Sequence, residues 1–254
     1  MSTRMIIFSL MIMIFTSLIS VDNEKKILYS ATEAYKLNDF DKALSLYSEL
    51  ETRNQKNPDI YYNIGNCYFR LNRIGLAILY YKKALLIDSS HSLAKKNLNF
   101  ALKFTLDKQD FENQNFLSNI INTAYQSLSL NALAWITLIL LTGLVTVIHA
   151  MIRKGQDYTH TKQMMLMIML AFNLVFIAWS GTRFYHYKHN NEAVISSSKV
   201  NAYSGPGENY TKLFTIHEGL IIKINKIDNA WTLVSLSNGF SGWVRTSTYK
   251  VVAI

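Results

Sequence analysis

Two long apolar stretches constrain the fold of this chain more than any other feature. Residues 132–152 and 164–182 are almost continuously apolar, and only eleven residues separate them. As helices they would be about 28–32 Å long, close to the thickness of the hydrocarbon core of a bilayer. A chain in contact with lipid must satisfy its backbone hydrogen bonds internally, so both stretches are predicted to be helices. Such a membrane hairpin would leave the two flanking parts of the chain on the same side of the membrane.

The positive charge of the chain gathers beside apolar segments. The net charge is +9, and most of the excess comes from Arg4, Arg153, Lys154, Lys162, Arg183 and Lys188. Basic residues between the two spans predict a cytoplasmic turn, with both flanking parts in the periplasm of a bacterial inner-membrane protein. No basic face remains elsewhere that could follow a phosphate backbone, so nucleic-acid binding is not expected.

The first residues have the composition of a secretory signal. Arg4 precedes an apolar run from Met5 to Phe15, and small polar residues follow up to Ser20. Residues 1–20 are therefore predicted to be a signal peptide, either cleaved or retained as an anchor. Both alternatives leave the following domain on the same side of the membrane.

Residues 24–54 and 58–91 share one pattern, offset by 34 positions. Small residues recur where two antiparallel helices would cross, and aromatic residues fill the space between these helices. The matching positions are Ala31, Ala34, Ala43, Tyr47 and Leu50 in the first copy and Gly65, Tyr68, Ala77, Tyr81 and Ala84 in the second. This spacing resembles the tetratricopeptide repeat, whose period is 34 residues. Residues 92–104 are predicted to form a helix that caps the stack.

The resemblance to tetratricopeptide repeats implies a concave groove that could hold an acidic or C-terminal peptide of a partner protein. By their position in the repeat pattern, the expected groove residues are Thr32, Tyr35, Lys36, Tyr62, Asn66, Phe69, Arg70 and Lys96. The alternative is that residues such as Asn66 and Phe69 belong to the repeat framework and contact no ligand.

Residues 113–131 are predicted to form an amphipathic helix beside the membrane. Apolar residues recur every four positions from Phe116 to Leu128, and the other face is polar and uncharged. This helix could lie on the membrane surface or pack beneath the repeat domain. Within the second span, Asn173 is expected to hydrogen-bond a neighbouring helix.

After residue 190 the residue pattern changes to one that is typical of short alternating strands and tight turns. Strands are predicted over 220–224, 231–236, 242–244 and 251–254, with an Asn-Gly hairpin turn at 237–239. The order SGPG, LFTIHEG, WTLVSLSNG and GWV resembles bacterial SH3-like domains, which implies a small barrel that binds peptides, including cell-wall peptides. The aromatic residues expected on its binding surface are Tyr203, Tyr210, Trp231 and Phe240. The alternative is a passive spacer with Trp231 and Trp243 in its core.

The sequence carries no motif that predicts catalysis or metal binding. Walker, HExxH, CxxC and Gly-x-Ser-x-Gly patterns are absent, and His186 and His189 lack a paired carboxylate at helical ligand spacing. Cys67 is the only cysteine, so an internal disulfide is impossible. A binding protein without cofactor or catalytic residues is therefore predicted.

The predicted fold is multidomain: all-α tetratricopeptide repeats, a two-helix transmembrane hairpin and a C-terminal all-β SH3-like barrel. The predicted segments are 1–20 (signal), 21–112 (two repeats and a cap), 113–131 (amphipathic helix), 132–152 (span), 153–163 (cytoplasmic turn), 164–182 (span) and 190–254 (barrel).

This order of segments resembles the E component of the Bacteroides aerotolerance (Bat) system. The resemblance implies a periplasmic scaffold that binds membrane proteins with von Willebrand factor A domains, in oxygen or oxidative-stress tolerance. A tether or sensor that binds peptidoglycan through the barrel is the alternative.

Overall fold

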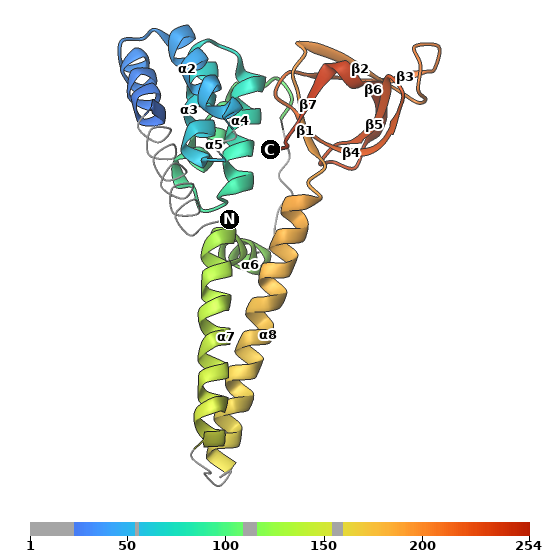
Figure 1. Cartoon of the computed structure of the whole chain (residues 1–254). Helices are drawn as coiled ribbons and strands as arrows, with labels where there is room; N and C mark the ends of the chain where they lie inside the picture. Colours follow the sequence, from blue (N-terminus) through green and yellow to red (C-terminus); the bar gives the residue numbers. More distant parts are fainter. Residues whose placement is uncertain (1–22, 54–55, 109–115, 154–159) are drawn as a thin grey trace, which may run out of the picture.

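The computed structural model describes residues 23–53, 56–108, 116–153 and 160–254. A stalk of two long helices carries a helical unit and a β-barrel side by side at one end (Figure 1). The predicted fold class is confirmed, because the structure contains helical repeats, two long apolar helices and an antiparallel all-β unit. The predicted signal segment 1–20 lies outside the described residues, as does most of the predicted turn 153–163.

The helical unit alternates helices with short turns. Residues 23–36 are helical and precede α2 (Phe40–Thr52), α3 (Pro58–Arg70), α4 (Ile74–Ile87), α5 (Ser92–Ala101) and the 3₁₀ turn η1 (Leu102–Phe104). Asn38 and Asn72, which are one repeat apart, have φ angles of 62° and 59°. Asparagine tolerates this left-handed conformation better than most residues, so both turns close in the same way. Pro58 begins α3 behind the N-cap Asn57, as its fixed φ allows.

The small residues of the repeat pattern lie where the helices cross. A Cβ atom added to Gly65 would lie 2.6 Å from the ring of Tyr81, so only glycine lets α3 approach α4 this closely. Ala31, Ala43, Ala77 and Ala84 are fully buried at corresponding crossings. The predicted repeat packing is therefore present in both helix pairs.

The C-terminal unit is one antiparallel sheet that curves into a barrel (Figure 1). Its strands are β1 (Glu192–Ile195), β2 (Lys199–Tyr203), β3 (Lys212–His217), β4 (Ile221–Asp228), β5 (Trp231–Ser235), β6 (Ser241–Arg245) and β7 (Tyr249–Val251). They are ordered β3-β2-β6-β5-β4-β1-β7. Gly239 has a φ of 87° in the β5–β6 turn, as expected for an Asn-Gly hairpin. Alternate residues such as Val200, Val234 and Val244 fill the interior.

The prediction of a closing strand over 251–254 was wrong. Strand β7 starts at Tyr249 and its pairing with β1 ends at Val251. Val252 still donates its backbone N–H to the carbonyl of Glu192, but its side chain is fully buried in a cluster that includes α4 residues. The chain leaves the sheet at this point because Val252 packs against the helical unit.

Among the described residues, two helices are long and apolar enough to cross a membrane. They are α7 (Leu130–Arg153) and α8 (His160–Lys188), and only 6% of the most apolar window of each is buried inside the protein. Both extend beyond the predicted spans 132–152 and 164–182 at each end. The Asn173 amide donates to the carbonyls of Met169 at 2.9 Å and of Leu140 in α7 at 3.4 Å. Helix α6 (Phe116–Gln126) lies where the stalk meets the two units (Figure 1).

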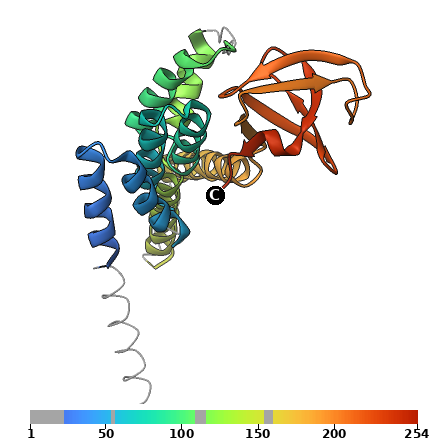
Figure 2. The same ribbon diagram turned by 90° about the horizontal axis from the view of Figure 1, so that it is seen from above.

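The helical unit and the barrel share a buried interface, which the sequence did not predict. Val194 of β1 and Val252 pack against Ala77 and Ile78 of α4, and all four are at most 1% exposed. Figure 2 shows the two units next to one another beside the end of α8.

Polar contacts between described residues also join the same two units. The backbone N–H of Gly75 donates to Glu218 Oε1 at 2.8 Å, and Lys82 pairs with Glu192 at 2.6 Å. Asp107 contacts the backbone N–H and the ring of His217 at the end of β3. The two units therefore form one head with a common core.

Candidate functional site

A network of amide and phenol groups includes two of the predicted groove residues, Tyr62 and Asn66. Asn66 Oδ1 accepts hydrogen bonds from Tyr81 Oη at 2.8 Å and from Asn97 Nδ2 at 2.9 Å. Asn97 also lies 3.4 Å from Tyr62 Oη, so α3, α4 and α5 meet in one network. The amide nitrogen of Asn66 makes none of these bonds. It is a donor available to a carbonyl or carboxylate of a bound chain.

An aromatic cluster lies beside this network. The ring of Phe69 lies 5.6 Å from that of Phe100 and 5.5 Å from that of Phe104, and Phe100 and Phe104 are 5.1 Å apart. Phe100 is 49% exposed and Phe104 is 56% exposed, which is unusual for rings that already pack together. We call these three residues the phenylalanine cluster. The repeat pattern predicted Phe69 but not Phe100 and Phe104, although the spacing of Lys96 and Phe100 on one helical face indicates them.

Arg70 follows Phe69 in α3 and contacts the first repeat. Its guanidinium lies 4.3 Å above the ring of Phe40 and donates to Asn38 Oδ1 at 3.2 Å. Tyr35 packs edge-on against Phe40, with ring centres 5.2 Å apart. No carboxylate pairs with Arg70 among the described residues. An exposed cation held beside aromatic rings can bind an acidic group at low entropic cost.

The remaining predicted groove residues differ in whether their side chains are free to contact a ligand. Thr32 donates to the carbonyl of Leu28 and lies 3.2 Å from the buried hydroxyl of Tyr47, so its hydroxyl serves the packing of the first helix pair. Lys36 pairs with Glu33 at 2.8 Å. Lys96 is exposed on α5, the helix that also carries Phe100.

The four predicted aromatic residues of the barrel lie in three separate places. Tyr203 and Trp231 pack edge to face, with ring centres 5.6 Å apart, and the guanidinium of Arg245 lies 5.3 Å from the Trp231 ring. Trp231 and Trp243 are both partly buried. The Tyr210 ring covers Gly205, where a Cβ atom would lie 2.4 Å from it, although the side chain remains 46% exposed.

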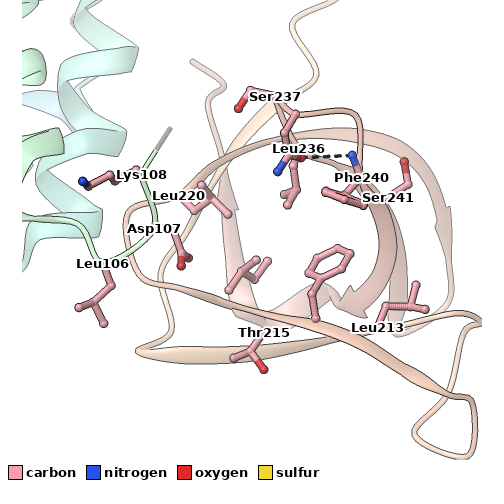
Figure 3. A pocket seen from close by; sticks show the side chains of 13 residues that line it. Leu106, Asp107, Lys108, Leu213, Thr215, Leu220, Leu236, Ser237, Phe240 and Ser241 are labelled. Atoms are coloured by element: carbon pink, nitrogen blue, oxygen red, sulfur yellow. Dashed lines mark hydrogen bonds between the residues drawn. The ribbon is translucent and has the colours of Figure 1, made fainter. Parts of the chain in front are cut away.

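Phe240 belongs to a pocket of about 650 Å³ at the junction of the barrel and the segment that follows η1 (Figure 3). Leu106, Leu213 and Phe240 line it and are 76%, 50% and 64% exposed. Strand β3 forms one wall and is an edge of the sheet, and the β5–β6 turn at Ser237 forms another. We call this the junction pocket. It presents apolar side chains to solvent next to a strand edge, a combination that suits an extended peptide.

Cys67 and Tyr81 are placed for packing rather than for chemistry. Burial raises the pKa of the Cys67 thiol to about 12, so at neutral pH it is protonated and a poor nucleophile. Burial also raises the pKa of Tyr81. Within the described ranges, no three His, Cys, Asp or Glu side chains gather closely enough to hold a metal ion.

Comparison with known families identifies both units. Residues 58–91 match the family model for the tetratricopeptide repeat, and residues 196–249 match that for the bacterial SH3 domain. The chain contains both modules. No curated protein matches the sequence. Tetratricopeptide repeats mediate protein–protein interactions, bacterial SH3 domains suggest cell-wall binding, and both are typically non-catalytic.

Proposed function

We propose that this protein is an inner-membrane adaptor that binds a partner protein through its repeat surface. Helices α7 and α8 anchor it, and both units of the head lie in the periplasm. The exposed phenylalanine cluster carries the proposal, because aromatic residues are enriched at protein–protein interfaces and clustered exposed apolar side chains mark interaction sites. Arg70 and Lys96 beside the cluster favour a partner segment that combines an apolar side chain with an acidic group.

The identity of the partner is a separate proposal. We infer from the order of modules that the chain acts as the E component of a Bat-type system. Its partners are then membrane proteins with von Willebrand factor A domains, and its role is in tolerance of oxygen or oxidative stress. The inference is supported by the order of the modules, in which the repeats come first, the two apolar helices follow and the bacterial SH3 domain is last.

Replacing Phe100 and Phe104 with serine should lower partner capture at least about tenfold, since a hot-spot aromatic contributes 2 kcal/mol or more. The measurement is quantitative mass spectrometry of proteins that co-purify with the tagged full chain from native membranes. Leu93→Ser is the matched control, because Leu93 is 54% exposed on the same helix and lies outside the cluster. Capture that is equal in the double variant and the wild type would refute binding through this surface.

Binding of cell-wall peptides by the barrel is the second candidate function, and the junction pocket favours it. Its exposed Leu213 and Phe240 lie beside the edge strand β3, in a domain that matches the bacterial SH3 family. The full chain in detergent should then co-sediment with purified peptidoglycan. Phe240→Ser should lower the bound fraction about three- to tenfold.

The control for this experiment is Ile227→Ser. Ile227 is 58% exposed on β4 and does not line the junction pocket. Failure of the wild-type chain to sediment, or equal sedimentation of both variants, would reject the cell-wall tether.

A further inference from the structure

A cationic site lies where the head meets the stalk. Thr137 of α7 and Ser180 of α8 are 3.0 Å apart, and Tyr125 of α6 reaches Thr182 at 3.3 Å. Arg183 follows directly, at the point where the apolar sequence of α8 ends. In a membrane-anchored protein this is the level at which lipid headgroups begin.

Arg183 has an incomplete set of partners. Its guanidinium donates to Ser89 Oγ and lies 5.2 Å from the ring of Tyr125. Its Nε–H is buried and has no hydrogen-bond acceptor in the part of the chain that the structure describes. Among the described residues, no carboxylate forms an ion pair with it. The side chain is partly buried, and an unpaired buried N–H is costly, so the arrangement favours an external anionic ligand.

Two cavities of about 380 and 300 Å³ adjoin this residue. Lys223 lines the first and Lys95 the second, while Arg183 and Glu192 line both. Of the described residues that line the two cavities, Glu192 is the only carboxylate, and it is already paired with Lys82 at 2.6 Å. The cavities therefore have a net positive charge that no described group neutralises.

Apolar side chains complete the same cavities. Leu85 and Leu86 of α4 line both, and Leu130 at the start of α7 lines the larger one. A ligand here would meet cations and leucines together, at the end of two lipid-facing helices. A free inorganic anion would leave the leucines without a partner, whereas a phospholipid would use both kinds of surface.

We propose that this site binds the phosphate headgroup of an anionic phospholipid, with Arg183 as its main cation and Lys223 and Lys95 around it. Leu85, Leu86 and Leu130 contact the glycerol and the first carbons of the acyl chains. The bound lipid fixes the head to the stalk, because Arg183 belongs to α8, Ser89 to the repeats and Lys223 to the barrel. The inference rests on the proposed membrane anchoring.

The test uses the full chain, purified in a mild detergent and stripped of lipid, with short-chain phosphatidylglycerol as the probe. Native mass spectrometry should show tighter binding of phosphatidylglycerol than of phosphatidylcholine. Arg183→Gln and Lys223→Gln should each weaken binding about fivefold, as expected for removing one cation near an anionic lipid. Lys226→Gln is the matched control, because Lys226 is exposed on the same strand as Lys223 and lines neither cavity.

Three outcomes would overturn the proposal: unchanged affinity in both Arg183→Gln and Lys223→Gln, equal affinity for the two lipids, or displacement of the lipid by inorganic phosphate at equal concentration. The last would identify a free-anion site. Lys223 is on the surface, so its variant remains informative if Arg183→Gln fails to fold. Carbonate extraction of native membranes separates the two proposals: release of the chain refutes the anchor, whereas retention without lipid selectivity refutes only the lipid site.

Discussion

Replacing Gly75 with valine should separate the barrel from the repeats while leaving each folded. A Cβ atom at Gly75 would lie 2.8 Å from the backbone oxygen of Ile195 and 2.5 Å from the side chain of Glu218. The backbone oxygen cannot move without shifting the end of β1, and the hydrogen bond from Gly75 to Glu218 would be lost as well. Overpacking and the lost bond together should weaken the interface by about 2–4 kcal/mol.

The separation can be measured with spin labels at Leu93 and Ile227, which are both exposed, one on each unit. The wild-type chain should give one narrow distance distribution by pulsed electron resonance, and Gly75→Val should give a broad one. Gly181→Val is the control, because nothing lies within 4 Å of a Cβ atom at that position. A narrow, unchanged distribution in Gly75→Val would show that the shared core does not hold the units together.

Replacing Tyr81 with alanine should lower the stability of the repeat unit more than any single substitution on its surface. Tyr81 is 1% exposed, packs against Gly65 and donates to Asn66. Loss of a large buried aromatic side chain costs about 3–5 kcal/mol. Tyr81→Phe keeps the ring and removes only the hydroxyl, so it should cost about 0.5–1.5 kcal/mol.

Cys67 provides the readout, because it is fully buried in the core of the repeat unit. Its alkylation in the native chain requires opening of this core, so the labelling rate follows the opening equilibrium. Tyr81→Ala should raise the rate about 10²–10⁴-fold, and Tyr81→Phe no more than about tenfold. Similar rates in the two variants would mean that the ring of Tyr81 does not support the core around Cys67.

The features that sequence analysis predicted are those encoded by short-range patterns. The small residues of the repeats recur at fixed spacing, and Gly65 and Ala77 lie at the helix crossings as expected. The Asn-Gly turn at Gly239 and the two apolar helices are likewise set by neighbouring residues. In each case the physical cause acts within one or two elements, so the pattern can be read from one segment of sequence.

The contacts that sequence analysis missed join residues far apart in the chain. Gly75 and Glu218 are separated by 143 residues, and Asp107 and His217 by 110. None of these four residues belongs to a periodic pattern or a motif that would indicate its partner. Arg183 was interpreted only as part of the charge bias beside a span, because its approach to Ser89 depends on how the repeats sit over α8.

The candidate binding residues were predicted only in part. The repeat pattern gave Asn66 and Phe69, but Phe100 and Phe104 lie in the capping helix and the turn after it, where the repeat consensus no longer applies. In the barrel, the sequence could not distinguish the Tyr203–Trp231 pair from Phe240, since their separation depends on the curvature of the sheet.

The shared core of the head has a consequence for avidity. Because the packing of Val194 and Val252 against α4 fixes the barrel to the repeats, the phenylalanine cluster and the junction pocket stay at one constant separation. A single partner long enough to reach both would bind the second surface as an intramolecular step, at an effective concentration on the order of millimolar. Two contacts that are each too weak to persist alone could then hold one ligand for long periods by this chelate effect.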